Sequence, residues 1–308
     1  MLISSLTLFF ALACHVALDA PAETAPDLVV LGVTQDGGLP HAGCQKNCCR
    51  EAWKNPKLQR RVSCLALVDP VSSECWMIDA TPDFKSQLRA LDEITAPSSL
   101  SGIFLTHGHI GHYTGLMQLG REVIGAKDVP VYAMPRMMDF LSRNGPWDQL
   151  VRLKNIALRL MQNDVPIILN SRLQITPFLV PHRDEYTETV GFRITGPRKS
   201  VLFIPDIDKW EKWDRRIEEV IAGVDVAYVD GTFYADGEIP GRSMAEIPHP
   251  FIVETMARLA SLPATEKSKV RFIHLNHTNP ALQRGSEAMK TIAKAGFLLA
   301  VEGEQVKL

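Results

Sequence analysis

The chain lacks an excess of either charge. Its 308 residues carry 33 Lys and Arg against 35 Asp and Glu, which gives a formal net charge of -2 and a pI near 6.5. Proteins that bind phosphate backbones non-specifically need a basic surface, because neutralising phosphates supplies most of their affinity. We therefore expect no nucleic-acid partner. A small-molecule substrate is the remaining expectation, and the sequence leaves the oligomeric state open.

The chain also lacks low-complexity segments and strong internal repeats, which excludes a solenoid. After the N-terminal leader it has no apolar run of transmembrane length. With 46% hydrophobic residues it can bury a substantial core. We expect residues 23–308 to form a single domain.

The leader itself is apolar but short. Residues 2–16 cannot span a bilayer, and the small residues Ala20-Pro21-Ala22 follow as a cleavage site. This pattern predicts a signal peptide at residues 1–22 and export, with the bacterial periplasm as the destination. The leader lacks Lys and Arg, which is unusual for a signal peptide. Because Cys14 follows Ala11-Leu12-Ala13, a lipid anchor at Cys14 is the alternative.

Histidine is scarce, yet it is concentrated in one segment. The chain has nine His, and three of them lie in residues 106–112, directly after the apolar run 102–105. A turn that leaves a buried strand can aim several imidazoles at one point, and imidazole is the commonest protein ligand for zinc. The segment predicts a metal centre, with a His-rich polar loop as the alternative.

Three more candidate ligands follow apolar runs elsewhere in the chain. They are His182, Asp206 and His274, and each ends a predicted strand. Ligands delivered by rigid strand ends are ordered before the metal arrives, which limits the entropy cost of binding. The Asp206 carboxylate could bridge two ions. Solvated or capping residues are the alternative. Zinc, iron and manganese all remain open, because the same N and O ligands suit each of them.

Hydrophobic periodicity predicts an α/β fold with many strands and with helices gathered after each group. The predicted strands cover residues 27–34, 64–68, 76–79, 129–133, 173–179, 190–195, 201–204, 224–229 and 270–274. The predicted helices cover residues 115–124, 136–143, 209–221, 251–262 and 282–295. Two sheets packed face to face and covered by helices on the outside are the expected architecture.

The segment His107-Gly108-His109-Ile110-Gly111-His112 resembles the His-x-His-x-Asp-His signature of the metallo-β-lactamase-fold hydrolases. Segments 78–84, 190–194, 230–233 and 273–280 resemble the branch with pyrroloquinoline quinone biosynthesis protein B, ribonuclease Z and the cyclic phosphodiesterase of phosphonate breakdown. The resemblance runs from about residue 28 to the C-terminus. It implies a four-layer αββα sandwich.

The resemblance also implies a ligand set for one or two divalent metals. One metal would bind His107, His109 and His182, and a second would bind Asp206, His112 and His274. The chain departs from the signature at Gly111, where the family has an Asp that ligates the second metal. Three alternatives follow from this loss. The protein holds a single ion, or the second site persists with water in place of the carboxylate, or another metal such as iron is preferred.

A second constellation contains three thiols in a Pro- and Gly-rich loop, at Cys44, Cys48 and Cys49. Thiolates at this spacing suit a closed tetrahedral zinc site. The resemblance implies a structural zinc here with His277 as a further ligand, although the cysteine spacing departs from the branch. A disulfide with Cys64 or Cys75 is the alternative, since export would permit it.

These residues predict a metal-dependent hydrolase in which a metal-activated water attacks a small anionic ester, most readily a phosphodiester. Asp206 would position metal and nucleophile, and the resemblance to ribonuclease Z implies that His249 protonates the leaving group. Asp79 and Asp83 are expected to orient loops by hydrogen bonds. One alternative is a mononuclear iron oxygenase like the quinone biosynthesis protein, which export argues against. Another is a non-catalytic metal-binding or ligand-binding envelope protein.

The leader makes a direct prediction. When the full chain is expressed in a bacterium, the mature protein should be found in the periplasm with Glu23 as its first residue, because cleavage follows Ala22. Intact mass spectrometry of fractionated cells measures this. A mature chain that retains residues 2–16 would contradict export by cleavage, and a lipid on Cys14 would favour the alternative.

Overall fold

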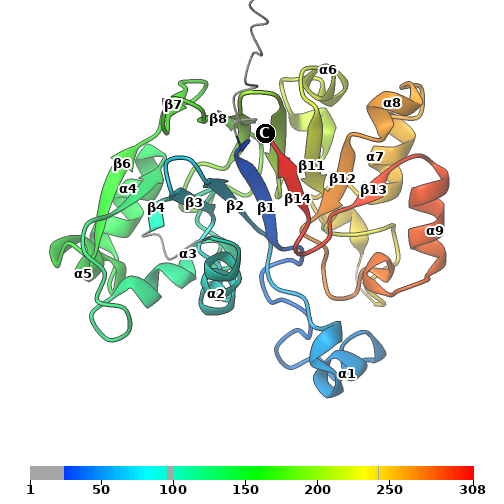
Figure 1. Cartoon of the computed structure of the whole chain (residues 1–308). Coiled ribbons are helices and arrows are strands. Elements are labelled where there is room, and N and C mark those ends of the chain that lie inside the picture. The colour runs from blue at the N-terminus through cyan, green and yellow to red at the C-terminus, as the bar shows by residue number, and fades with distance from the viewer. Residues whose placement is uncertain (1–23, 96–99, 242) are drawn as a thin grey trace, which may run out of the picture.

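The computed structural model describes residues 24–95, 100–241 and 243–308 (Figure 1). The predicted signal peptide at residues 1–22 and the lipidation candidate Cys14 lie outside these ranges. Among the described helices, none combines the length and the apolar composition that a membrane crossing requires. Two mixed sheets of seven strands each form the centre of the described structure.

The first sheet has the order β14-β1-β2-β3-β4-β5-β6. Its strands are β1 (Asp27–Gly32), β2 (Cys64–Asp69), β3 (Glu74–Ile78), β4 (Leu100–Phe104), β5 (Val129–Ala133), β6 (Ile156–Leu160) and β14 (Gln305–Lys307). Pairing is antiparallel from β14 to β3 and parallel from β3 to β6. The carboxyl ends of β3 and β4 therefore lie at the same edge, which brings the residues after β3 beside those after β4.

The second sheet has the order β13-β12-β11-β10-β9-β8-β7. Its strands are β7 (Ile167–Ile168), β8 (Gln174–Leu179), β9 (Val190–Thr195), β10 (Ser200–Ile204), β11 (Val226–Asp230), β12 (Val270–Ile273) and β13 (Leu298–Leu299). β10 to β13 are parallel, and β8 has the same direction because β9 is antiparallel to both β8 and β10. The carboxyl ends of β8, β10, β11 and β12 thus share one edge.

Helices cover the outer faces of both sheets (Figure 1). The α-helices are α1 (Asn47–Lys54), α2 (Phe84–Ile94), α3 (Ile110–Tyr113), α4 (Pro135–Arg143), α5 (Trp147–Arg152), α6 (Ile217–Ala222), α7 (Ile252–Arg258), α8 (Ala264–Lys267) and α9 (Glu287–Lys294). Short 3-10 helices are η1 (Pro56–Leu58), η2 (Thr114–Leu119), η3 (Trp210–Lys212), η4 (Met244–Glu246) and η5 (Pro280–Leu282). In Figure 1, α1 projects away from the layers, beyond one end of β1.

Three layers of apolar side chains hold the four layers of backbone together. Alternate residues of one strand serve different layers: Leu65 and Leu67 of β2 pack between the sheets, whereas Cys64 and Ala66 pack in the layer that contains α2 residue Phe84. A third layer lies between the second sheet and α6, α7 and α9. Because both faces of each sheet are covered, the strands read as continuous apolar runs. The predicted αββα sandwich is confirmed.

Several predicted helices are shorter than the sequence suggested. The helix expected at 115–124 is the short 3-10 helix η2, and the Gly115 amide at its start donates to the Ala80 carbonyl outside the helix at 2.8 Å. The helix expected at 282–295 begins only at residue 287, because Gly285 turns the chain at φ +76° and the Ser286 hydroxyl accepts a hydrogen bond from the Met289 amide. Likewise, the helix expected at 209–221 is replaced by the separate short helices η3 and α6. The helix expected at 251–262 is the shorter α7.

Candidate metal centre

All six ligands predicted for the metal centre lie at the carboxyl edges of the strands. His107, His109 and His112 follow β4, His182 follows β8, Asp206 follows β10 and His274 follows β12. The segment after β4 is fixed to the second sheet, because the Val190 amide donates to the Thr106 carbonyl and the Gly108 amide donates to the Thr187 hydroxyl. The two sheets therefore contribute candidate ligands to a common centre.

The first ligand group consists of His107, His109, His182 and Asp206. One donor atom from each residue lies within 4.8 Å of the others. His107 Nε2 lies 3.3 Å from Asp206 Oδ2, and His182 Nε2 lies 3.3 Å from Asp206 Oδ1. Atoms that share a tetrahedral zinc at ordinary bond lengths are separated by about 3.3 Å. The group thus has the separations of a coordination site.

The second ligand group contains Asp36, His112 and His274, again within 4.8 Å of one another. His112 Nε2 and His274 Nε2 each lie 3.9 Å from Asp206 Oδ2. The Asp206 carboxylate consequently faces both groups. Asp36 was not among the residues singled out from the sequence. The sequence did hold a signal for it, because Asp36 follows the predicted strand 27–34 just as Asp206 follows the predicted strand 201–204.

Unpaired buried atoms show that these groups fit a cation. Within the described residues, several buried polar atoms that have no hydrogen-bond partner face this centre: Asp36 Oδ1, His112 Nε2, His182 Nε2, Asp206 Oδ1 and His274 Nε2. Burying polar atoms unpaired costs free energy, and such atoms are rare in folded proteins. A divalent cation that prefers N and O ligands would satisfy all of them.

Hydrogen bonds on the far side of the rings fix their orientation. His112 Nδ1 donates to Asp79 Oδ2 at 2.7 Å, and His182 Nδ1 donates to Asp208 Oδ1 at 3.2 Å. His274 Nδ1 donates similarly to the Thr232 hydroxyl at 2.9 Å. Each bond leaves Nε2 as the atom that points into the centre, which is the usual role of such partners.

Asp79 and Asp83 act as the sequence predicted, as hydrogen-bond acceptors that orient loops. Asp79 accepts from the Thr106 amide and hydroxyl, and Asp83 accepts from the Val62 amide. Asp79 and the candidate ligand His274 both have left-handed backbones, with φ of 70° and 64°. Such conformations cost about 1–3 kcal/mol each and persist where the surroundings determine them. The fold therefore holds strained backbone at the metal centre.

Burial and neighbouring charges set the protonation of His107 and Asp206. Burial lowers the pKa of His107 well below its usual value, so the ring is a neutral donor at physiological pH. Burial acts to raise the pKa of Asp206, but the imidazoles of His182 and His249 outweigh it and hold this pKa well below its usual range. Asp206 is thus an ionised carboxylate in the interior.

His249, predicted as a proton donor, lies beside the first group. Its Nδ1 is 2.8 Å from Asp230 Oδ2 and 3.2 Å from Asp206 Oδ1. Burial disfavours protonation, but the charges of Asp230 and Asp206 outweigh it and raise the pKa of His249 to about 9. Asp230 also accepts from the Thr232 amide and hydroxyl, which fixes its carboxylate. Sequence analysis assigned no role to Asp230, although it directly precedes the Gly231-Thr232 turn at a strand end.

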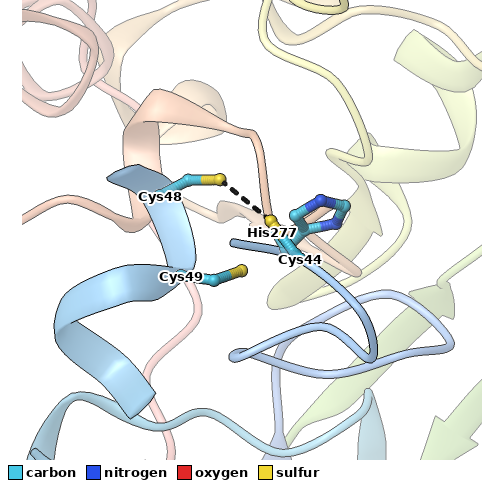
Figure 2. A group of neighbouring side chains, drawn as sticks. All are labelled: Cys44, Cys48, Cys49 and His277. Carbon is cyan, nitrogen blue, oxygen red and sulfur yellow. Dashed lines mark hydrogen bonds between the residues drawn. The ribbon is translucent and has the colours of Figure 1, made fainter. Parts of the chain in front are cut away.

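The thiol cluster of Cys44, Cys48, Cys49 and His277 converges as well (Figure 2). Cys48 and Cys49 lie on α1, Cys44 precedes α1, and His277 comes from the loop after β12. One donor atom of each lies within 4.8 Å of the others, and Cys44 Sγ is 3.7 Å from Cys48 Sγ. The three thiols of the cluster are not in disulfides. The alternative partners Cys64 and Cys75 lie in the core layer beneath α2.

Comparison with known proteins gives a family and a fold. The sequence model of the beta-lactamase superfamily domain matches residues 76–294. Coenzyme PQQ synthesis protein B of Methylobacterium sp. (strain 4-46) is 26% identical over 302 residues, which cover 89% of this chain and 97% of the relative. The crystal structure of zinc-bound PqqB from Methylobacterium extorquens superposes with a TM-score of 0.76 at 23% identity, covering 92% of this chain and 100% of that one. A diphosphatase of the PhnP family superposes with a TM-score of 0.62 at 22% identity, covering 91% and 96%.

The orientation of His112 can be tested through Asp79. The Asp79→Asn variant keeps the shape and tolerates the left-handed backbone, but it removes the charge that His112 Nδ1 contacts. Cation affinity at the second group should fall by about 10–100-fold. Competition with a chromophoric chelator measures this. The exposed Asp92→Asn variant is the matched control, and equal affinities of the two variants would contradict the role of Asp79.

Proposed function

Since the chain belongs to the β-lactamase superfamily and has the metallo-β-lactamase fold, we propose that it is a hydrolase with two divalent cations that acts on a small anionic ester. A phosphodiester is the first substrate class to test. One observation carries the proposal: the buried Asp206 carboxylate faces two separate groups of donors, with His249 at its side. That arrangement has the components of a two-metal hydrolytic centre.

Each cation would have its own histidine ligands. His107, His109 and His182 would hold the first, His112 and His274 would hold the second, and Asp206 would be shared between them. Zinc is the first expectation, with iron and manganese as alternatives. When bound, the cations would supply a polarised substrate oxygen and a lowered pKa for water.

The remaining chemistry belongs to side chains of the chain itself. Asp230 engages His249 at Nδ1, so Nε2 is the ring atom available to a substrate. From there His249 would deliver a proton to the departing oxygen as the ester bond breaks. Asp206 would link the two ligand groups, because its carboxylate lies 3.3 Å from His182 Nε2 and 3.9 Å from His112 Nε2.

A cationic side chain lies near the centre and is paired with a carboxylate there. Arg183 follows His182, its side chain is 51% exposed, and it lies 4.0 Å from Glu185, which also contacts His109. Burial is the main reason that the pKa of His109 is lowered, and the Arg183 charge adds to this effect, so the guanidinium lies within electrostatic reach of the centre. A cavity of about 740 Å³, which Asp36, Ile110 and Arg60 help to line, adjoins the same region. Its size is that of a small-molecule site.

A second candidate is a step in coenzyme PQQ synthesis, as a mononuclear iron oxygenase. It is favoured by the curated relatives, which carry the name coenzyme PQQ synthesis protein B and match nearly the whole chain. The two candidates differ in metal content and in co-substrate. One tightly held iron with oxygen uptake would support the second candidate, whereas two cations with hydrolysis in the absence of oxygen support the first.

The hydrolase proposal predicts that the effect of replacing His249 depends on the leaving group of the ester. The His249→Ala variant should lose about 10²–10⁴-fold in kcat on a phosphodiester with an alkoxide leaving group, because that oxygen needs a proton. The loss should be small on a p-nitrophenyl ester, whose leaving group departs as an anion. Steady-state kinetics on the two esters, with metal content measured alongside, give the comparison.

Two results would contradict the proposal. Equal losses on both esters at unchanged metal content would remove the role of His249. If the metal-loaded wild-type protein hydrolyses no phosphodiester, lactone or β-lactam, the proposed hydrolase function is wrong. The paired His107→Ala and His109→Ala variant is the background control, because binding of a ligand could survive in it but hydrolysis could not.

We also propose that the thiol cluster holds a structural zinc. Burial raises the pKa of the Cys49 thiol to about 12, so a cation is needed to hold it as a thiolate. The Cys49→Ser variant should lose one zinc per chain and melt at a lower temperature, because zinc ties α1 to the loop after β12. Elemental analysis and thermal melts measure both. The His107→Ala variant should keep this zinc, and unchanged zinc content in Cys49→Ser would contradict the site.

A further inference from the structure

Gly111 occupies the position at which the His-x-His-x-Asp-His signature has a carboxylate. It lies in α3, between the ligands His109 and His112. A Cβ built on Gly111 would lie 2.1 Å from Asp36 Oδ1 and 2.7 Å from Asp36 Cα. Real Cβ atoms do not make such contacts. A side chain at position 111 and the observed position of Asp36 therefore exclude each other, because the Asp36 carboxylate fills the space that the missing side chain would enter.

The backbone around Asp36 is held firmly next to a known part of the centre. The Gln35 amide donates to the Leu275 carbonyl, and the Leu275 amide donates to the Val33 carbonyl. The Gly38 amide closes the turn by donating to the Gln35 carbonyl at 2.8 Å. The loop after β1 is thus bonded to the residue that directly follows His274. This pairing fixes where the Asp36 side chain begins.

The Asp36 carboxylate points at the two histidines of the second group. Its Oδ1 is 3.6 Å from His112 Nε2, and it lies within 4.8 Å of the donor atom of His274. The side chain is 26% exposed, yet Oδ1 is buried without a hydrogen-bond partner. His112 Nε2 and His274 Nε2 are likewise buried and unpaired. Three unpaired donor atoms from three separate segments face one point.

We propose that Asp36 supplies, from a different loop, the carboxylate ligand that Gly111 cannot supply. The second cation is then held by Asp36, His112 and His274, with Asp206 shared. This inference rests on the proposed two-cation centre and completes it. The exchange keeps one carboxylate and two imidazoles at the second site, so the loss of the Asp from the signature leaves the charge of the site unchanged. Gly111 is required because a larger residue would displace Asp36.

Metal binding tests the inference without reference to activity. The Asp36→Asn variant should hold one metal ion fewer per chain than wild type after dialysis against a competing chelator. Its affinity for the second ion should fall by more than the roughly 10–100-fold that follows loss of an outer hydrogen-bond partner. Elemental analysis and cobalt(II) absorption titrations measure both quantities. Asp92→Asn, which removes the same charge from an exposed position of α2, is the matched control.

An exchange variant separates ligation from folding. Asp36→Gly combined with Gly111→Asp moves the carboxylate to the position of the family signature, and it should regain the ion that Asp36→Asn loses. Gly111→Asp alone should bind less well than the exchange variant, because the two carboxylates compete for one space.

Three outcomes would overturn the assignment. They are an Asp36→Asn variant that keeps the second ion with the affinity of the control, an exchange variant that folds but does not regain the ion, and a wild-type centre that holds only one ion. The proposed hydrolysis fails separately. If wild type binds two ions and loses one with Asp36 but cleaves no ester, the ligand assignment stands and the proposed function does not.

Discussion

The burial of one carboxylate governs the rest of the centre. Asp206 is 2% exposed, and an unpaired charge in such a position costs several kcal/mol. Imidazoles from both sheets surround it, and cations between carboxylate and imidazoles would compensate it fully. Asp206 Oδ2 lies near His107 of the first group and near His112 and His274 of the second, and Oδ1 lies near His182, so the carboxylate links the two ligand groups. The single Asp206 side chain therefore joins the two ligand groups that the strand ends bring together.

The strand directions of the fold bring the residues that surround Asp206 to one edge. β8, β10, β11 and β12 run in one direction and end at one edge, so His182, Asp206, Asp230 and His274 arrive there without long connections. The first sheet adds the histidines after β4. Asp79 bonds both Thr106 and His112, which ties the end of β3 to this segment. Strain in the backbones of Asp79 and His274 is tolerated because the packed layers fix both neighbours.

Sequence analysis predicted the layered fold and the convergence of His107, His182 and Asp206 because the signals are local. An apolar run predicts a buried strand, and a polar residue at its end lies at the sheet edge. The helices were predicted less well, since tertiary hydrogen bonds such as that from the Gly115 amide to the Ala80 carbonyl leave no periodic signal in the sequence. α1 and α2 were not predicted at all. The short α1 carries Cys48 and Cys49, which the sequence analysis placed in a loop; the cysteine spacing indicated the thiol cluster but not the helix.

The role of Asp36 was beyond sequence analysis for a different reason. The missing carboxylate at Gly111 was visible in the sequence, but its replacement depends on the loop after β1 pairing with Leu275, residues separated by most of the chain. Contacts of that range are fixed by the packing of the two sheets. A departure from a family signature can thus be compensated in space by a segment that the signature does not include.

The central claim is that two cations share Asp206. Anomalous scattering from crystals of the protein purified without added metal, recorded at the absorption edges of zinc and iron, tests this most directly. At this centre the account predicts two peaks about 3.5–4 Å apart on either side of the Asp206 carboxylate, one beside His107 and His182 and the other beside His112 and His274, in addition to the zinc peak expected at the thiol cluster. A single peak at the centre, or a pair of peaks there that Asp206 does not contact, would contradict it.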